Sequence, residues 1–156
     1  MSIRSIRRVK GVMTIGALTA SLLGGTAVFA SPAAAAYAGH CNVNQVTSVD
    51  VTPGYSITRP AYMPEGSYSR TAYCWMDYGS KGFGVEWLQF TLNSCYGFNL
   101  ATDGDFGSNT RSALASAQQQ EGITADGIYG TQSRQYLKFP RYREINGDRS
   151  GCESVN

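Results

Sequence analysis

The sequence contains a single histidine, His40, and its four cysteines include no Cys-x-x-Cys pair. Zinc sites are built mainly from several histidine and cysteine ligands at short, regular spacings. One histidine close to the expected start of an exported chain also gives no base for a Cys–His pair or a Ser–His–Asp triad. We therefore expect no metal, no cofactor and no histidine-dependent hydrolase site.

Runs of positive charge are absent after residue 10. Four of the 13 Lys and Arg residues lie in residues 1–10, and all 11 Asp and Glu residues lie after residue 38. The chain from residue 39 onward thus carries nine basic and 11 acidic residues. A surface that binds nucleic acid needs clustered Lys and Arg. We expect no nucleic-acid partner.

Long hydrophobic stretches are limited to residues 11–30, which follow the basic residues and precede SPAAAAYAG. This is the layout of a secretory signal peptide. Cleavage after Ala38 or after Ala36 leaves small residues at the required positions, and Ala30 is a third site. We take residues 1–38 as a cleaved signal peptide and expect a secreted protein with no membrane contact after cleavage. An uncleaved membrane anchor is the alternative, since about 20 apolar residues span a bilayer.

All four cysteines follow this segment: Cys41, Cys74, Cys95 and Cys152. An even number in an exported chain indicates two disulfides, for which three connectivities exist. We favour Cys41–Cys74 with Cys95–Cys152, because each bond then ties a terminal segment to a neighbouring element. A bond that closes a loop of this size contributes about 3 to 5 kcal/mol.

Residues 39–82 are rich in Tyr, Ser, Thr, Gly and Pro, which predicts irregular structure or short strands separated by turns. We favour packing within a small arm over contact with sugars as the role of its aromatic residues. These residues are Tyr55, Tyr62, Tyr68, Tyr73, Trp75 and Tyr78. The stretch DYGSKGFG at residues 77–84 is interpreted as a glycine-rich hinge.

One pattern occurs twice. Residues 103–114 read DGDFGSNTRSAL and residues 126–137 read DGIYGTQSRQYL, an offset of 126 − 103 = 23 residues. In an Asp-Gly turn the Asp side chain accepts backbone hydrogen bonds and Gly supplies a positive φ. The aromatic residue of each copy, Phe106 or Tyr129, then enters the core, and the Ser or Thr after the second glycine begins a helix. The repeat therefore predicts a turn that caps and aims a helix, used twice.

Apolar spacing supports helices around this repeat. Val85, Leu88 and Leu92 share one face of a first helix that ends at Gly97. A second helix follows the first copy and continues to Gly122. A third runs from residue 131 to about residue 138, where the approach of Pro140 stops it.

These features together resemble the three-helix peptidoglycan-binding domain of bacterial cell-wall hydrolases. The resemblance covers residues 85–137 and rests on Val85, Leu88, Gln89, Leu92, Asn93, DGDFG, Thr110, Ala113, Leu114, Gln118, Gly122, Ile123, DGIYG and Leu137. Ser108 and Thr131 stand where the family usually has Pro, and Ala117 stands where it usually has Phe. The layout as a whole is similar to small secreted peptidoglycan-binding proteins of Gram-positive bacteria.

The resemblance implies a mainly α fold, in which a three-helix domain with two DGxxG turns follows an irregular or short-strand, disulfide-linked arm. We expect the arm at residues 39–82, the domain at residues 83–140, and a C-terminal tail at residues 141–156 tied by Cys152. The implied function is non-catalytic binding of peptidoglycan, through its glycan or its stem peptide, by a secreted, cell-wall-associated protein.

The implied contacts lie in a shallow groove beside the two turns. The candidates are Asp103, Phe106, Thr110 and Arg111 in the first copy and Asp126, Tyr129, Ser133 and Arg134 in the second. For the two aromatic residues, packing in the core is favoured over ligand contact. The two arginines have better claims, because a guanidinium pairs well with the carboxylates of stem peptides.

Three other functions were weighed. A glycosidase needs two carboxylates, and Glu65, Glu86, Glu121, Glu144 and Glu153 are scattered without a motif. A calcium loop beginning at Asp103 is disfavoured, because Ser108 replaces the required Gly and Leu114 the required Glu. A protein-interaction or inhibitor role carried by the arm stays open.

Overall fold

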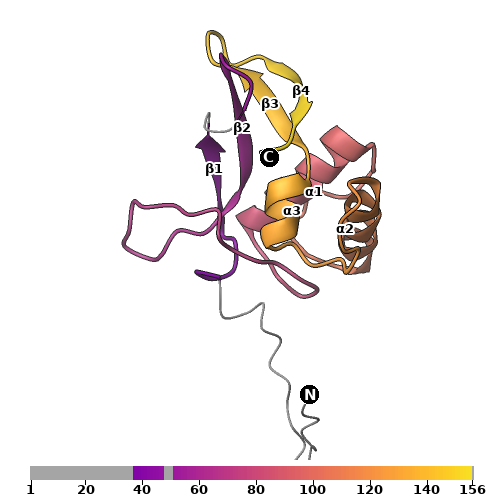
Figure 1. The fold of residues 1–156 in the computed structure, drawn as a ribbon. Coiled ribbons are helices and arrows are strands. Elements are labelled where there is room, and N and C mark those ends of the chain that lie inside the picture. The colour runs from indigo at the N-terminus through magenta and orange to yellow at the C-terminus, as the bar shows by residue number, and fades with distance from the viewer. Residues whose placement is uncertain (1–36, 48–50, 156) are drawn as a thin grey trace, which may run out of the picture. The chain divides into compact units, whose positions relative to one another are not determined.

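The structure is a computed structural model that describes residues 37–47 and 51–155 (Figure 1). The expected signal peptide lies outside the described residues except for Tyr37 and Ala38, which are part of the fold. The described residues form three helices: α1 at Phe83–Tyr96, α2 at Ser108–Gln120 and α3 at Thr131–Tyr136. They also form four strands: β1 at Val43–Thr47, β2 at Tyr55–Ala61, β3 at Phe139–Arg143 and β4 at Arg149–Glu153.

The expectation of a mainly α fold is wrong. All four strands form one antiparallel sheet in the order β1-β2-β3-β4, so the N-terminal arm and the C-terminal tail are joined in a single layer. The strands are 5, 7, 5 and 5 residues long, against helices of 14, 13 and 6 residues. The fold is therefore mixed.

The sequence predicts a C-terminal tail at residues 141–156 tied by Cys152, and Pro140 as the stop of the preceding helix. In the structure Pro140 lies within β3, paired with Cys152 of β4. The ladder between β2 and β3 reaches only from Tyr55–Arg143 to Ile57–Arg141. Pro140 lies beyond its end, so no hydrogen bond to β2 is lost because proline has no N–H. A proline is therefore compatible with this strand.

The helices follow the predicted apolar spacing. Val85, Leu88 and Leu92 of α1 are fully buried, and the helix ends at Gly97, whose φ of 75° is left-handed. Helix α3 ends at Tyr136, earlier than expected, because the next residue, Leu137, is already extended. None of the helices within residues 37–47 and 51–155 has the length and apolar character needed to cross a bilayer.

One hydrophobic core unites the sheet and the helices. Ile57 of β2 and Phe139 of β3 belong to the same buried cluster as Leu88 of α1 and Leu114 of α2. In Figure 1 the three helices are grouped together and the strands extend away from them. The repeat region is thus supported by a sheet that the repeat itself does not encode.

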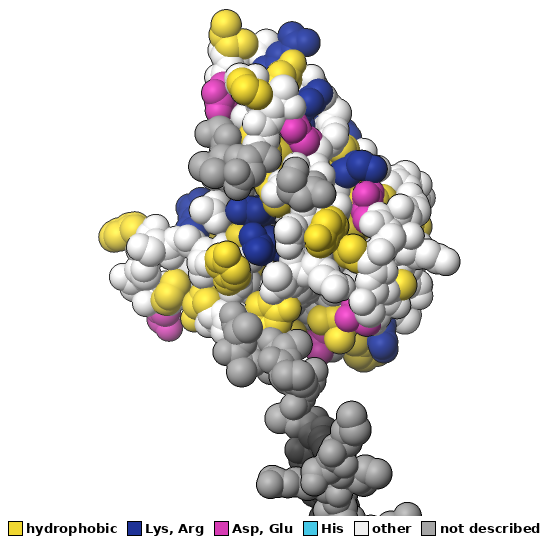
Figure 2. All heavy atoms as spheres, in the orientation of Figure 1, with side chains coloured by type: hydrophobic (Ala, Val, Ile, Leu, Met, Phe, Trp, Pro, Cys, Tyr) yellow, Lys and Arg dark blue, Asp and Glu magenta, His cyan; other side chains and the backbone are white. Residues whose placement is uncertain are grey.

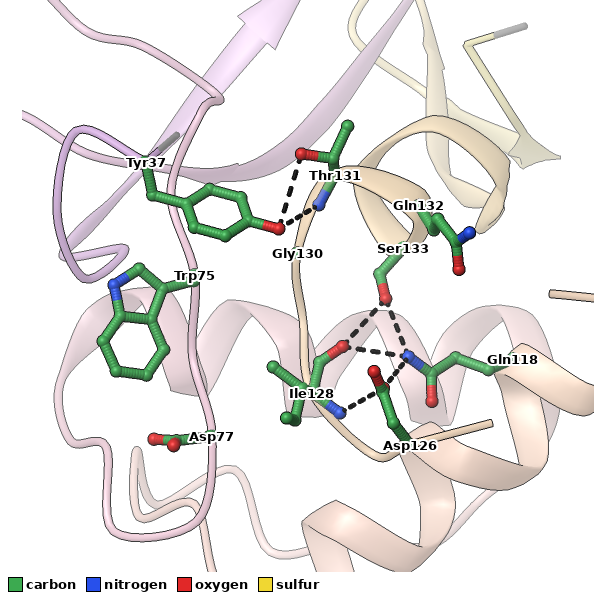
Figure 3. A pocket seen from close by; sticks show the side chains of 10 residues that line it. All are labelled: Tyr37, Trp75, Asp77, Gln118, Asp126, Ile128, Gly130, Thr131, Gln132 and Ser133. Atoms are coloured by element: carbon green, nitrogen blue, oxygen red, sulfur yellow. Dashed lines mark hydrogen bonds between the residues drawn. The ribbon is translucent and has the colours of Figure 1, made fainter. Parts of the chain in front are cut away.

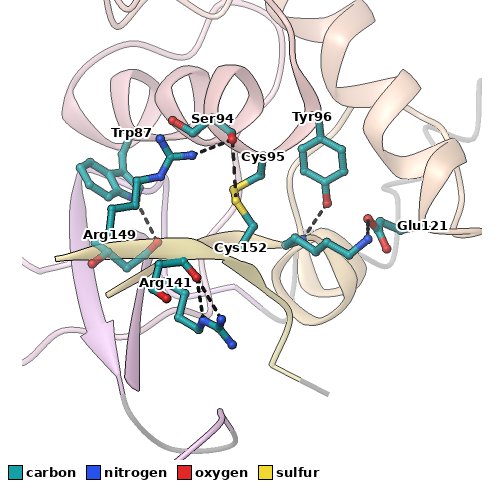
Figure 4. Close-up of a disulfide and its surroundings, with 11 residues drawn as sticks. Trp87, Ser94, Cys95, Tyr96, Glu121, Arg141, Arg149 and Cys152 are labelled. Atoms are coloured by element: carbon teal, nitrogen blue, oxygen red, sulfur yellow. Dashed lines mark hydrogen bonds and ion pairs between the residues drawn. A yellow bond between two sulfur atoms is a disulfide. The ribbon is translucent and has the colours of Figure 1, made fainter. Parts of the chain in front are cut away.

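The two disulfides are Cys41–Cys74 and Cys95–Cys152, the pairs favoured from the sequence. The second joins the last turn of α1 to β4 (Figure 4). Beside it, Arg149 donates from Nη2 to the Ser94 carbonyl at 2.7 Å.

Candidate functional site

Both Asp-Gly turns adopt the predicted geometry. Oδ1 of Asp103 accepts the backbone N–H of Asp105, and Oδ1 of Asp126 accepts that of Ile128, each at 2.9 Å. The glycines that follow the two aspartates have φ values of 74° and 68°. The two copies therefore form the same local structure.

A buried glutamine from α1 holds the first turn. Gln89 donates from Nε2 to Asp103 Oδ1 at 2.8 Å, to the Asp105 carbonyl at 3.0 Å and to Thr110 Oγ1 at 3.2 Å. Its Oε1 accepts the backbone N–H of Gly104 at 3.0 Å. Because Gln89 is only 2% exposed, these bonds satisfy an amide that would otherwise be costly to bury.

Gln118 of α2 does the same for the second turn. Its Nε2 donates to Asp126 Oδ1 at 3.0 Å, to the Ile128 carbonyl at 2.9 Å and to Ser133 Oγ at 3.0 Å. Its Oε1 accepts the N–H of Gly127 at 2.8 Å. Both glutamines are part of the resemblance, but their role in holding the turns was not predicted. The signal was a polar residue on the apolar face of each helix before a turn.

Residues 76–82 fix the two turns to one another, so the interpretation of this region as a hinge is wrong. The backbones of Met76 and Tyr129 exchange two hydrogen bonds, of 3.0 and 2.8 Å. The N–H of Phe106 donates to the Ser80 carbonyl at 2.9 Å, and the N–H of Gly79 donates to the Phe106 carbonyl at 3.0 Å. The glycines of this segment allow it to run along the two turns and do not make it a flexible connection.

A groove of about 390 Å³, the second-turn groove, lies between the arm and the second copy. Figure 3 shows Tyr37, Trp75 and Asp77 on the arm side. The opposite wall is formed by Gln118, Asp126, Ile128 and residues 130–133. The groove is therefore built jointly by segments from the two halves of the sequence.

Tyr37 is held at the edge of this groove by the start of α3. Its hydroxyl accepts the backbone N–H of Thr131 at 2.9 Å and lies 3.4 Å from Thr131 Oγ1. A Cβ at Gly130 would come within 2.3 Å of the Tyr37 hydroxyl oxygen. The glycine at this position therefore permits the close approach of the ring.

A second depression of about 310 Å³, the first-turn groove, lies beside the first copy. Its lining includes Asp103, Asp105, Gly107 and Leu100 but no aromatic residue. A Cβ at Gly107 would meet nothing within 4 Å, so no side chain takes the place that Tyr37 has in the second copy.

The charges of the first-turn groove are partly neutralised. Lys81 Nζ pairs with Asp105 Oδ1 at 2.5 Å, and this hydrogen bond raises the pKa of Lys81. The pKa of Asp103 is lowered, first by the backbone N–H of Asp105 and then by the Gln89 side chain. The carboxylate that builds the turn is thus stabilised in its ionised form.

Four of the eight candidate contacts line the grooves. Asp103 and Thr110 line the first-turn groove, and Asp126 and Ser133 line the second-turn groove. All four also hold the turns through the glutamine bonds described above. Their hydrogen-bonding capacity is therefore already used in part.

The other four candidates do not line either groove. Phe106 and Tyr129 are 2% and 0% exposed and belong to the core, and burial raises the pKa of the Tyr129 hydroxyl. Arg111 lies with its aliphatic stem against Gly127, and the Arg134 guanidinium stacks over Tyr73 at 4.4 Å from the ring centroid.

Two groove residues were missed by sequence reasoning. Tyr37 was assigned to the signal peptide, and the aromatic residues of the arm, Trp75 among them, to packing. One feature of the sequence is compatible with this contact. Position 131 is Thr and not Pro, so it keeps the backbone N–H that donates to the Tyr37 hydroxyl.

None of the five glutamates considered for catalysis lines either groove. Glu121 pairs with Lys138 at 3.0 Å, and Glu153 pairs with Arg141 at 3.3 Å. Within residues 37–47 and 51–155, no three His, Cys, Asp or Glu side chains are grouped as metal ligands would be.

Comparison with known proteins gives one family match, and it covers the repeat. Residues 81–137 match the family model described as "Putative peptidoglycan binding domain". No curated protein matches the chain. A crystal structure of a peptidoglycan-binding protein from Clostridioides difficile, in complex with glutamine hydroxamate, matches with 26% identity over 56% of this chain and 51% of that chain. Its TM-score is 0.39, so it carries no structural argument, and the present chain spans about half of its length.

Proposed function

We propose that this protein binds cell-wall peptidoglycan without cleaving it, and the match of residues 81–137 to the family model described as "Putative peptidoglycan binding domain" supports the proposal. The observation that carries the proposal is the second-turn groove. It lies within the family segment on one side and against the aromatic arm on the other.

The composition of the groove supports ligand binding. Ligand sites are typically concave and apolar, with a few polar groups that fix orientation. Trp75, Tyr37 and Ile128 supply the apolar surface, and Thr131 and Gln132 supply polar groups at the start of α3. An indole can cover a sugar ring or an aliphatic part of a stem peptide, and it loses little conformational entropy on binding.

In this proposal the arm and the helical domain act together. Trp75 follows Cys74, whose bond to Cys41 joins two segments of the arm, the one that carries Trp75 and the one that follows Tyr37. The backbone bonds between Met76 and Tyr129 extend this attachment to the wall of the groove. An interaction role for the arm alone is therefore disfavoured.

The proposal is tested by cosedimentation of the oxidised protein with purified peptidoglycan, with cellulose and chitin as competing insoluble polymers. We expect peptidoglycan to retain the protein and the other two to retain little. Trp75→Ala should weaken binding by about tenfold, the effect of losing a central aromatic contact. Tyr68→Ala is the matched control, because Tyr68 is fully exposed away from the groove lining.

Turbidity of the same suspension separates binding from cleavage. A constant turbidity over several hours, with the protein in the pellet, is expected for a non-catalytic protein. Clearing of the suspension would show hydrolysis and would overturn the non-catalytic part of the proposal. Circular dichroism of Trp75→Ala is needed alongside, because Trp75 also packs against His40, with ring centroids 3.9 Å apart.

We further propose that the protein is secreted and that processing occurs after Ala36, so that Tyr37 is retained. This choice among the three cleavage sites is supported by the bond of Tyr37 to Thr131 and by the bond from the Ala38 N–H to the Tyr73 carbonyl at 2.9 Å. Mass spectrometry of the exported protein should give a chain that starts at Tyr37. A chain starting at Gly39 would contradict the proposal.

A further inference from the structure

The charged side chains that line the second-turn groove are all acidic. Asp77 and Asp126 are the charged residues among those that line it, and they come from opposite walls. Neither takes part in an ion pair with another residue in the described part of the chain. Asp77 accepts a single side-chain hydrogen bond, from Ser80 at 3.3 Å, and Asp126 uses Oδ1 to build the turn.

Three basic side chains near the two turns do not line this groove. Lys81 is paired with Asp105 of the first turn, and the Arg134 guanidinium is stacked on Tyr73. Arg111 rests its stem on Gly127 but does not line the groove. On the face shown in Figure 2, Lys and Arg side chains lie over the strands and also in the middle of the face. The groove itself therefore favours a cation and disfavours an anion.

The aromatic walls strengthen this preference. A cation is attracted to the face of Trp or Tyr, and the attraction grows when water is excluded. In the second-turn groove the rings of Trp75 and Tyr37 stand on the same side as Asp77 and face the wall that carries Asp126 (Figure 3). An ammonium group placed there would contact aromatic surface and lie near carboxylates at the same time.

We propose that the second-turn groove binds a primary ammonium group, and that on peptidoglycan this group is the side-chain amine of the diamino acid in stem peptides that are not cross-linked. The inference rests on the proposed function and names the part of the polymer that is recognised. It replaces the expectation that arginines select stem-peptide carboxylates, because the groove contains no arginine. Cross-linked peptides, whose amine has become an amide, bind weakly.

The first test compares untreated peptidoglycan with peptidoglycan whose free amines have been acetylated with acetic anhydride. Acetylation removes the positive charge and leaves the glycan and the carboxylates in place. We expect the affinity of the wild-type protein to fall by about tenfold, the loss of one cation contact in a partly dry groove. Added N-α-acetyl-lysine amide should compete for untreated peptidoglycan, and its N-ε-acetylated form should not.

Single substitutions locate the effect. Asp126→Asn keeps an oxygen at Oδ1 for the turn but removes the charge, and it should weaken binding to untreated peptidoglycan by about tenfold. Asp103→Asn, the same change at the first turn, is the matched control and should leave binding within about twofold. Asp77→Asn gives an independent check, since Asp77 has no part in the turn. Thermal unfolding verifies that all three variants fold.

The outcomes distinguish the two proposals. Equal binding to acetylated and untreated peptidoglycan would overturn the ammonium inference and indicate recognition of the neutral glycan, while peptidoglycan binding itself would stand. Equal loss in Asp103→Asn and Asp126→Asn would also overturn it. Failure to bind untreated peptidoglycan would overturn the proposed function and the inference with it.

Discussion

The two Asp-Gly turns are alike in their internal bonds and unlike in their surroundings. Each is held by one buried glutamine that makes four hydrogen bonds. The second turn, however, lies beside Tyr37, Trp75 and Asp77 of the arm, whereas the first has Lys81 paired with its own Asp105. Duplication thus provides two equivalent frameworks, and the arm converts one of them into an aromatic groove.

The comparison shows that the arm, and not a change in the turn itself, separates the copies. Gly107 faces open space, but the equivalent Gly130 is covered by the hydroxyl of Tyr37. Ser108 and Thr131 both keep an N–H where proline would have none, and the N–H of Thr131 is bonded to the arm. Substitutions made in pairs, one at each turn, can therefore separate what the turns share from what the arm adds.

The largest effect is expected from loss of the disulfide within the arm. Replacing Cys41 and Cys74 together by Ala should lower the free energy of unfolding by about 3 to 4 kcal/mol. Binding to peptidoglycan should fall as well, because the segments that carry Tyr37 and Trp75 are no longer joined by a covalent bond. Urea unfolding and cosedimentation measure the two quantities.

The control for this variant is the double replacement of Cys95 and Cys152 by Ala. It should lower the free energy of unfolding by at least as much, because this bond closes a longer loop, with a sequence separation of 57 against 33. It should leave the groove in place. If the Cys41/Cys74 variant binds as well as the Cys95/Cys152 variant under conditions where both are folded, the arm does not form the site.

The next largest effect concerns the glutamines. Gln89→Ala and Gln118→Ala should each lower the free energy of unfolding by about 2 to 4 kcal/mol, because buried backbone and carboxylate groups lose their partner. Gln120→Ala, at an exposed position of α2, is expected to be nearly neutral. Chemical denaturation compares the three. A near-neutral result at one buried glutamine would mean that the turns are not equivalent frameworks.

A smaller difference is expected from proline at the first residue of each helix. Thr131→Pro removes the N–H that Tyr37 accepts, which should cost about 0.5 to 1.5 kcal/mol. Ser108→Pro lacks this loss and should be neutral or slightly stabilising, because proline suits the first helical position. Thermal unfolding of the two variants tests the difference. Greater stability of Thr131→Pro than of Ser108→Pro would show that the Tyr37 bond contributes nothing.

The smallest effect is a pH dependence at the first turn. The pKa of Asp103 is lowered from its usual 3.8 by the N–H of Asp105 and by Gln89. The folded state therefore binds fewer protons than the unfolded state, and the stabilisation is present above pH 3.8 and lost as the pH falls below it. Urea midpoints measured across the acid range should fall less steeply for Asp103→Asn than for the wild type. Identical curves would contradict the role of this carboxylate.

Sequence reasoning succeeded where interactions are local. The Asp-Gly turns, the burial of Phe106 and Tyr129 and the start of each following helix depend on bonds between residues close in the chain. The C-terminal hairpin was missed although a local signal was present. Asn146-Gly147, where Gly147 has a φ of 73°, is a typical turn pair and lies between β3 and β4.

The pairing of β2 with β3 had no such signal, because it joins segments more than 80 residues apart along the chain, as in Tyr55 with Arg143. The sheet follows from burial of Ile57 and Phe139 against the helices, a property of the assembled core. For the same reason the arm was expected to be a separate element, although it shares its sheet with the tail.

The sequence by itself determined that this protein has two capped turns, two helices launched from them and, through the same residues, a likeness to peptidoglycan-binding domains. The tertiary structure decided which of the two grooves is lined by aromatic residues, and we infer from it what that groove attracts. Tyr37 and Thr131 are 94 residues apart, and Asp77 and Asp126 come from separate segments. Their juxtaposition arises when the core, the sheet and the backbone bonds between Met76 and Tyr129 bring the arm to the second turn, and no spacing along the chain encodes it.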